Sequence, residues 1–318
     1  MKVYFAPLEG ITGYLFRQTY QEFFGGIDRY FTPFLAPNQS GGLRTREVTD
    51  IQPENNRGIV LIPQILTNHA PAFLKTAQWL AELGYAEVNL NLGCPSGTVT
   101  AKRKGAGLLG DPELLASFLD EIFTRCPIRI SIKTRIGMNR PEEFPDLLAL
   151  YNRYPVSELI VHPRIGAEAY RGHPHREWFA YAASHTDIPL VYNGDLFRAA
   201  DIRQFCDAFP DADTIMLGRG LLADPGLLRK WKGEPAPDKQ TIAAFHEALV
   251  ERYRTVLSGD RNLLFHCKEI WAFLAYLFEN HEKYAKKIRK AATMDKYRAA
   301  VDALFAEQDL REDSAYGK

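Results

Sequence analysis

Eight short runs of apolar and β-branched residues recur before residue 220, and their spacing constrains the fold more than any other feature. Their starts lie roughly 25 to 40 residues apart, and stretches with helical periodicity separate most of them, such as 70–84 and 111–123. Near-continuous apolar strands that alternate with amphipathic helices indicate a parallel sheet covered by helices. The runs span residues 3–7, 28–34, 59–65, 86–91, 128–134, 157–162, 188–193 and 213–218.

Eight such units predict an α/β fold of the (β/α)8 or TIM-barrel type. The alternative is a doubly wound open sheet, which would normally carry a glycine fingerprint after its first strand. This chain has Pro7-Leu8-Glu9-Gly10 at that place, so the barrel is favoured.

The helix signals agree with this layout. Asp111-Pro112 predicts an N-cap followed by the first residue of a helix, and Gly84 predicts the end of the preceding one. A linker, KGEPAPDK, follows Trp231, and residues 241–310 are helical in pattern without strand signals. We therefore expect a barrel domain in residues 1–232 and a helical domain in residues 240–318.

Composition excludes several classes of protein. The chain has 318 residues, 46% of them hydrophobic, with 39 basic and 39 acidic side chains, which is ordinary globular composition. No apolar run approaches the roughly 18 residues of a membrane span, and the first residues do not resemble a signal peptide. Four cysteines without CxxC spacing indicate reduced thiols in a cytoplasm, with no zinc site and no disulfide framework.

The charge is unevenly distributed along the chain. Residues 228–300 hold 15 basic against 9 acidic side chains, whereas residues 1–227 hold 22 against 25. The excess is concentrated between Lys283 and Arg298 and suits a polyanionic partner, although a solvated helix face is the plainer alternative. Helical spacing places four lysines on one face: Lys283, Lys286, Lys287 and Lys290.

Polar residues end the predicted apolar strands, and in a barrel the carboxyl ends of all strands meet at one mouth. Caps and surface positions would explain one or two of them, but not the whole set. The set comprises Pro7-Leu8-Glu9, Thr32, Gln64, Asn91 to Cys94, Lys133, His162, Asn193-Gly194-Asp195 and Gly218-Arg219-Gly220.

The last two of these loops predict a phosphate site. Barrels often bind phosphate after their seventh and eighth strands, where glycines let backbone N–H groups approach the anion and an arginine adds a charged contact. A phosphorylated cofactor such as FMN fits, although both loops can also be simple glycine turns. Lys133 would then hold negative charge on the reduced flavin ring. A Schiff-base lysine or a lysine on the barrel rim are the alternatives.

Cys94 lies in the loop Asn91-Leu92-Gly93-Cys94-Pro95-Ser96, directly after the fourth strand. A thiol with an ordinary pKa of about 8.5 is mostly protonated at neutral pH and can donate a proton. The loop continues to Lys102-Arg103-Lys104, three consecutive cations that suit a polyanionic substrate, unless they are merely solvated. Burial is the expectation for the other cysteines.

With these motifs in this order, the chain resembles the tRNA-dihydrouridine synthases. The motifs are APLEG, NLNLGCPSGTVTAKRKGAGLL at residues 89–109, SIKTRIG, VHPR with the later Ala169-Tyr170-Arg171-Gly172, YNGD and LGRG. They cover about residues 3 to 230, and the segment around Cys94 is the most specific.

The resemblance implies an enzyme that reduces the C5=C6 bond of a tRNA uridine, with FMN as cofactor, NADPH as reductant and Cys94 as proton donor. It implies that FMN is held by Pro7, Leu8, Glu9, Gln64, Lys133, His162, Asn193, Gly194, Asp195, Gly218 and Arg219. It also implies that Asn91 bonds the target base and that RNA lies near Arg164, Tyr170 and Arg171. With tRNA as substrate, the cations expected to contact it are Lys102, Arg103, Lys104 and Lys268, with Lys286, Lys287 and Lys290 on the basic helix. No protein partner is indicated.

The chain departs from the family pattern in two places. Pro33 follows Thr32, where relatives often have a glutamate, and the helix at 266–278 holds Glu269 and Trp271, where many carry basic residues.

Three rival functions are a flavin barrel acting on a free pyrimidine, like dihydroorotate dehydrogenase, a non-catalytic RNA-binding protein, and a lysine aldolase. The basic segments disfavour the first. The presence of Cys94, Lys133 and the phosphate loops disfavours the second.

Overall fold

The structure, a computed structural model that describes residues 1–317, contains a (β/α)8 barrel, as the strand spacing predicts. Nine strands occur in the described chain, all parallel to their neighbours, in the order β3-β2-β1-β9-β8-β7-β6-β5-β4. They are β1 (Lys2–Phe5), β2 (Arg29–Phe31), β3 (Leu61–Ile62), β4 (Gln64–Ile65), β5 (Glu87–Leu92), β6 (Arg129–Arg135), β7 (Leu159–His162), β8 (Leu190–Tyr192) and β9 (Thr214–Leu217).

Strands β3 and β4 are two halves of one predicted strand, which Pro63 interrupts. A proline has no backbone N–H and cannot donate to the ladder, so the regular pairing stops there. Its carbonyl still accepts a hydrogen bond from the Asn89 N–H at 2.8 Å. Eight barrel strands therefore appear as nine segments.

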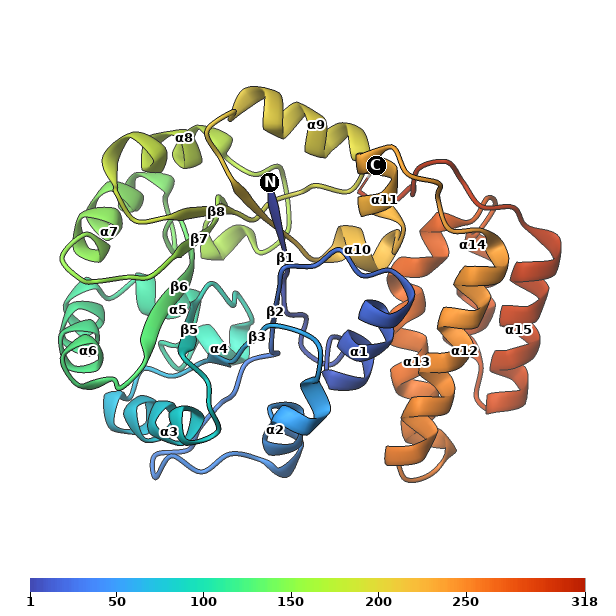
Figure 1. Cartoon of the computed structure of the whole chain (residues 1–318), viewed down its shortest axis with the longest axis horizontal. Helices are drawn as coiled ribbons and strands as arrows, with labels where there is room; N and C mark the ends of the chain where they lie inside the picture. Colours follow the sequence, from blue (N-terminus) through green and yellow to red (C-terminus); the bar gives the residue numbers. More distant parts are fainter. Residues whose placement is uncertain (318) are drawn as a thin grey trace. The chain divides into compact units, whose positions relative to one another are not determined.

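The chain divides into two compact units. The first holds residues 1–7, 28–194 and 209–216, and the second holds 8–27, 195–208 and the remainder from Leu217. Helices α3, α6, α7 and α8 of the first unit lie outside the ring of strands (Figure 1). The helices of this unit are α2 (Thr45–Asp50), α3 (Ala70–Glu82), α4 (Gly97–Thr100), α5 (Ala106–Leu109), α6 (Pro112–Arg125), α7 (Phe144–Tyr151) and α8 (Arg176–His185), with short 3-10 turns at Pro53–Asn56, Pro141–Glu143 and Gly166–Glu168.

The predicted helix boundaries in the first unit are confirmed. The Asp111 carboxylate accepts a hydrogen bond from the Leu114 N–H at 3.2 Å, which makes it the N-cap of α6. Gly84 has a φ of 91° just after α3, a conformation that favours glycine.

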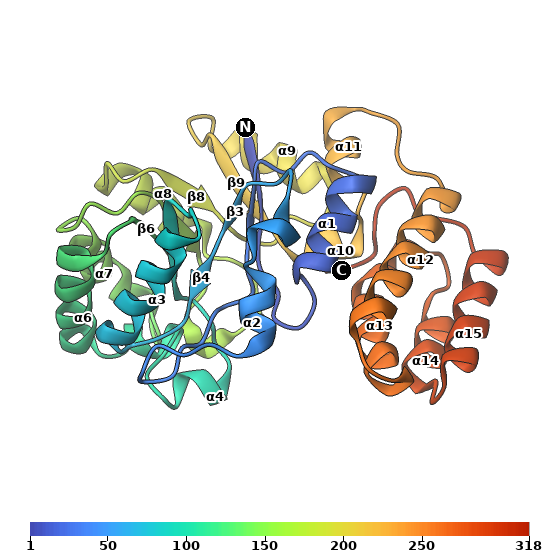
Figure 2. The same cartoon turned by 60° about the horizontal axis from the view of Figure 1, so that its bottom comes forward.

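The second unit is helical, which confirms the helical pattern predicted for residues 241–310. Helix α12 packs against both α1 and α13, α13 against α14, and α14 against α15 (Figure 2). The domain boundary near 232–240 stays a prediction. The helices are α1 (Tyr14–Phe23), α9 (Ala199–Ala208), α10 (Arg219–Ala223), α11 (Leu227–Lys232), α12 (Lys239–Val256), α13 (Asp260–Leu274), α14 (Glu282–Lys290) and α15 (Met294–Glu307), with a 3-10 turn at Ala275–Leu277.

Packing between α1 and α12 rests on aromatic and ionic contacts. The Phe245 ring meets Phe16, Phe23 and Phe24 edge-on, with centroids 4.9 to 6.0 Å apart. Arg252 donates to Thr19 Oγ1 at 2.9 Å and forms an ion pair with Glu22. None of the helices within residues 1–317 is long and apolar enough to cross a bilayer.

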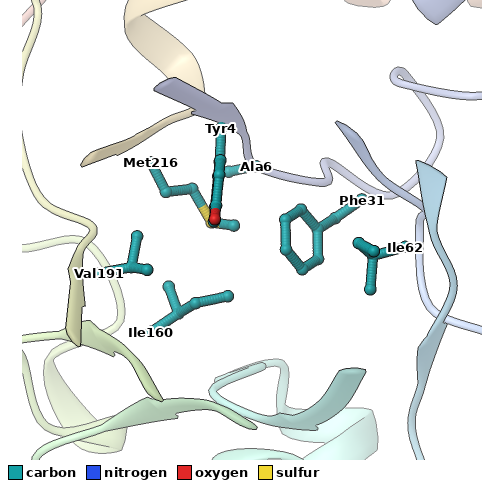
Figure 3. Close-up of a cluster of buried hydrophobic side chains, with 7 residues drawn as sticks. All are labelled: Tyr4, Ala6, Phe31, Ile62, Ile160, Val191 and Met216. Carbon is teal, nitrogen blue, oxygen red and sulfur yellow. The ribbon is translucent and has the colours of Figure 1, made fainter. Parts of the chain in front are cut away.

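The barrel interior is closed by side chains from most of its strands. Figure 3 shows them converging from β1, β2, β3, β7, β8 and β9. Because successive strand residues point to opposite faces, one residue in two contributes to this core. The cluster comprises Tyr4, Ala6, Phe31, Ile62, Ile160, Val191 and Met216, each no more than 6% exposed.

We predict that Ile160→Ala lowers the free energy of unfolding by about 2–5 kcal/mol, because it leaves a cavity in this buried cluster. Ile160 is 0% exposed, whereas Val60 is 55% exposed, so Val60→Ala is the matched control and should change stability by less than about 0.5 kcal/mol. Urea unfolding followed by circular dichroism measures both. Equal midpoints for the two variants would show that the interior does not carry the barrel's stability.

Candidate active site

Strand register brings several predicted site residues to the barrel interior. Asn91 pairs with Lys133, and Lys133 pairs with Ile160, so the three form one row across β5, β6 and β7. Paired residues of a parallel ladder point to the same face, and Ile160 points inward (Figure 3). Asn91 and Lys133 therefore also face the interior.

A ladder of buried side-chain amides crosses the barrel from β2 to β6. Gln64 Nε2 donates to Asn89 Oδ1 at 2.8 Å, and Asn89 Nδ2 donates to Ser131 Oγ at 2.9 Å. The Gln64 N–H in turn donates to Thr32 Oγ1 at 2.9 Å. Each of these hydrogen bonds replaces one that the buried amide can no longer make to water. Together the bonds hold each amide in a single orientation.

Asn91 connects this ladder to the thiol. Its Nδ2 donates to Gln64 Oε1 at 2.7 Å, and its Oδ1 accepts from the N–H groups of Gly93 at 3.0 Å and Cys94 at 2.9 Å. The Cys94 carbonyl accepts from the Ala106 N–H at 3.0 Å. The half-buried Cys94 is thus fixed through its N–H and its carbonyl.

Glycines allow the rest of the Cys94 loop to fold back on itself as helices α4 and α5. Gly105 has a φ of 56°, and a Cβ on Gly107 would lie 2.6 Å from the Thr100 carbonyl oxygen. A side chain at Gly107 would therefore push α5 away from α4.

The basic stretch of this loop is held by its backbone. Asn68 Nδ2 donates to the carbonyls of Lys102 and Arg103, each at 3.1 Å, and Arg103 pairs with Asp111 at 2.8 Å. Burial, together with the nearby charge of Lys102, lowers the pKa of Lys104. Lys102 and Arg103 are exposed. Contact of these cations with RNA stays a prediction.

Sequence reasoning missed Arg135, which links two loops at the barrel mouth. Its Nε donates to the Gly93 carbonyl and its Nη1 to the Ile165 carbonyl, both at 2.8 Å, and its guanidinium lies 5.5 Å from the Tyr170 ring centroid. Burial lowers the pKa of Arg135 to about 10. The signal was available, because Arg135 stands two residues after Lys133 and so faces the same side of β6.

Arg164 supports the loop after β7 from within. It is 0% exposed, and it donates to the Gly172 carbonyl at 2.8 Å and the Arg171 carbonyl at 3.3 Å. It also lies 3.1 Å from His162 Nε2. Direct contact of Arg164 with RNA would require this loop to open.

Tyr170, in contrast, is 55% exposed, and its ring lies 6.1 Å from that of His162. Arg171 is exposed as well. The loop therefore presents Tyr170 and Arg171 outward and keeps Arg164 inside.

Lys133 is the residue that most clearly fits a bound anion. Burial and the nearby charge of Arg135 lower its pKa to about 7. No side chain or carbonyl of the described chain accepts a hydrogen bond from its amine. An unbonded amine beside the amides of Gln64 and Asn91 is a donor set that fits the polar pyrimidine edge of the expected flavin.

Asn193 and Gly194 end β8 in the first unit. Asn193 Nδ2 donates to the Met216 carbonyl at 2.8 Å, and a Cβ on Gly194 would lie 2.2 Å from the Tyr192 hydroxyl.

Asp195 and Arg219 belong to the second unit and form an ion pair at 2.7 Å. Pro7 is half-buried after β1. Gly218 is the N-cap residue of α10.

Glu269, one of the departures from the family pattern, faces the loop that holds Leu8 and Glu9. A Cβ on Gly10 would lie 3.3 Å from Glu269 Oε2, a buried oxygen that has no hydrogen-bond partner within residues 1–317. Burial and the charge of Glu9 raise the pKa of Glu269. The Leu8 N–H donates to Thr12 Oγ1 at 2.8 Å, which closes the turn.

The basic face of α14 exists as predicted. Tyr284 and Ile288 are its buried residues, so the exposed residues gather opposite them: Lys283, Lys286, Lys287, Arg289 and Lys290. Lys268 does not join this face, because its amine donates to the Ala291 carbonyl at the end of α14.

The expectation that the other cysteines are buried holds for Cys267, and burial raises the pKa of this thiol to about 12. Cys126 and Cys206 are half-buried.

Similar folds occur among solved structures. Morphinone reductase in complex with tetrahydroNAD aligns with a TM-score of 0.51 and 15% identity, over 76% of this chain and 89% of that one. Old Yellow Enzyme from Pichia sp. AKU4542 aligns with a TM-score of 0.54 and 9% identity, over 74% and 84%. At such identities the likeness is one of fold alone.

Fold and site together define a (β/α)8 barrel with polar side chains gathered at its mouth, and the family match below adds that it is a flavin-dependent oxidoreductase. The sequence profile described as Dihydrouridine synthase (Dus) matches residues 4–309, and the chain belongs to this family. The tRNA-dihydrouridine(16) synthase of Aquipseudomonas alcaligenes is 33% identical over 247 residues, which cover 72% of this chain and 75% of that protein. The protein of the same name in Escherichia coli K12 is 30% identical over 295 residues, covering 89% and 91%.

We predict that Lys133 makes the stability of the apoprotein depend on pH. Its folded pKa of about 7 lies below the unfolded value of about 10.4, so the unfolded chain holds the extra proton between these values. The cost of burying the charged amine is complete below pH 7 and is relieved as pH rises, so stability increases with pH through this window. Lys133→Met should flatten that increase.

Urea midpoints of the apoprotein at pH 7, 8 and 9 measure the effect. Lys75→Met, which removes an exposed lysine, should run parallel to the wild type. If the midpoints of Lys133→Met also rose with pH as those of the wild type do, protonation of the Lys133 amine would not destabilise the folded protein.

Proposed function

We propose that this protein is a tRNA-dihydrouridine synthase that binds FMN, uses NADPH as reductant and acts on uridine 16. The observation that carries the proposal is the fixed loop that holds Cys94 at the barrel mouth, beside the Lys133 row. Position 16 is proposed because relatives that align over most of this chain have that name.

The chemistry follows from the substrate. The C5=C6 bond of uracil is conjugated to the C4 carbonyl, so it accepts a hydride at C6 and a proton at C5. When bound, FMN would supply the hydride, with NADPH as the reductant. Cys94 Sγ would supply the proton to C5. The thiol is reset by taking a proton from solvent after product release.

Cofactor binding is assigned to the residues expected from the sequence. In the first unit, Lys133 neutralises negative charge on the pyrimidine edge of the flavin, and Gln64, held by the amide ladder, orients it. Pro7, His162, Asn193 and Gly194 complete this group. In the second unit, Arg219, which is paired with Asp195, binds the phosphoryl group beside Gly218. Leu8 and Glu9, in the loop after β1, are also assigned to the cofactor.

A stacked base cannot reach Cys94, so the target uridine must leave the RNA stack and enter the mouth. The second N–H of Asn91 is assigned to the base, since its first N–H donates to Gln64 and its oxygen holds the loop. Tyr170 is exposed and flat, which suits stacking against RNA bases, and Arg171 beside it suits phosphate. The basic face of α14 is assigned to the RNA backbone.

We expect Cys94→Ala to retain FMN, because the thiol is a proton donor and not a cofactor ligand. Dihydrouridine formation on unmodified tRNA should fall by about 10²–10⁴-fold. Cys206→Ala, which removes a half-buried thiol elsewhere, should keep wild-type activity. Visible absorbance reports FMN, and nucleoside analysis reports the product. A Cys94→Ala enzyme with full turnover would remove the thiol from the reaction.

We expect Lys286→Glu combined with Lys287→Glu to raise KM for tRNA by about tenfold or more, since both reverse charges on the proposed RNA face. The rate of flavin reduction by NADPH should not change, because that step needs no RNA. Lys75→Glu combined with Arg125→Glu makes the same charge change on α3 and α6 and should leave KM unaltered. Equal KM values for both double variants would take α14 out of the interface.

A further inference from the structure

The segment at residues 310–317 places Tyr316 close to Arg219, the residue assigned to the phosphoryl group. The Arg219 guanidinium lies 5.3 Å from the Phe197 ring centroid and 6.0 Å from the Tyr316 ring centroid. Tyr316 also shares a hydrogen bond with Arg219, in which the guanidinium donates to the phenol oxygen. All of these residues belong to the second unit.

Tyr316 is held in this place by its own contacts. Its ring packs edge-on against Tyr276, with centroids 5.2 Å apart and planes at 90°, and against Phe197 at 5.2 Å. The Ala315 N–H donates to the Tyr276 carbonyl at 3.0 Å, and the Tyr316 N–H donates to Ser314 Oγ at 3.2 Å. Ser314 is fully buried. The segment is therefore packed, and Tyr316 is positioned before any ligand arrives.

A phosphoryl group beside Arg219 would need a further hydrogen-bond donor. Arg219 and Asp195 neutralise one another, so a phosphoryl group that binds to Arg219 meets a carboxylate close by. Burial raises the pKa of Tyr316, which keeps its hydroxyl protonated at neutral pH. The phenol oxygen accepts from Arg219, and its hydrogen can then point to an anion, a charge-assisted arrangement.

We propose that Tyr316 is a phosphate-binding residue of this protein, which donates its hydroxyl hydrogen to the phosphoryl group of FMN and holds Arg219 in position for the same group. The inference rests on the proposed binding of FMN. It goes beyond family membership, because the family match ends at residue 309 and Tyr316 lies after it.

The test compares two flavins that differ only in the phosphoryl group. The apoprotein is titrated with FMN and with riboflavin, and quenching of flavin fluorescence gives Kd for each. Tyr316→Phe keeps the ring and its packing but loses the hydroxyl, so FMN should bind about tenfold more weakly, the loss of one hydrogen bond to a charged group. The Kd for riboflavin should not change. Tyr316→Ala should weaken FMN binding further, toward the level of Arg219→Ala.

Tyr154→Phe is the matched control, since its hydroxyl bonds Asp120 at 2.7 Å in the first unit. It should leave both Kd values unchanged. If wild-type protein bound no FMN, the proposed function would fail and this inference with it. If the wild type bound FMN but Tyr316→Phe kept its Kd, or lost affinity for both flavins equally, only the role of Tyr316 would be overturned.

Discussion

The side-chain oxygen of Asn91 accepts hydrogen bonds from the N–H groups of Gly93 and Cys94, and the geometry of the barrel mouth depends on this contact. The same side chain is fixed from behind by Gln64, so the position of the thiol is tied to the amide ladder that runs through β2, β4, β5 and β6. Arg135 secures the loop a second time through the Gly93 carbonyl. In the proposed reaction the proton donor must meet one carbon of one ring, and such fixing removes the cost of ordering the loop during that reaction.

The barrel mouth of the first unit is rich in buried cations. Arg135 and Arg164 use their N–H groups on backbone carbonyls, which hold the loops after β5 and β7 in place. Among the described residues Lys133 has no such bond, and its pKa of about 7 reflects burial next to Arg135. An amine that is costly to charge in the apoprotein gains most from an anionic ligand, which links the stability of the barrel to the binding proposed for it.

Much of the fold could be predicted because the barrel imposes a regular spacing on its strands. The eight apolar runs, the Asp111 N-cap and the helical region after residue 240 follow local rules, and the structure has them all. Pro63 splits one strand without changing its place in the barrel.

The site was harder to predict, because burial decides what a polar side chain does. Arg164 and Lys268 carry charges that suggest RNA, yet both bond to backbone carbonyls. Arg135 was missed because it lies one residue beyond the predicted strand at 128–134, and Tyr316 because its partner is distant in the sequence.

The proposed function is tested most directly by mapping dihydrouridine in tRNA from cells that lack this protein, and again after the purified enzyme is added back. It predicts that dihydrouridine is lost at position 16 alone, that the wild-type enzyme with FMN and NADPH restores it, and that the enzyme without the Cys94 thiol does not. Unchanged dihydrouridine at every position of tRNA from those cells would contradict it.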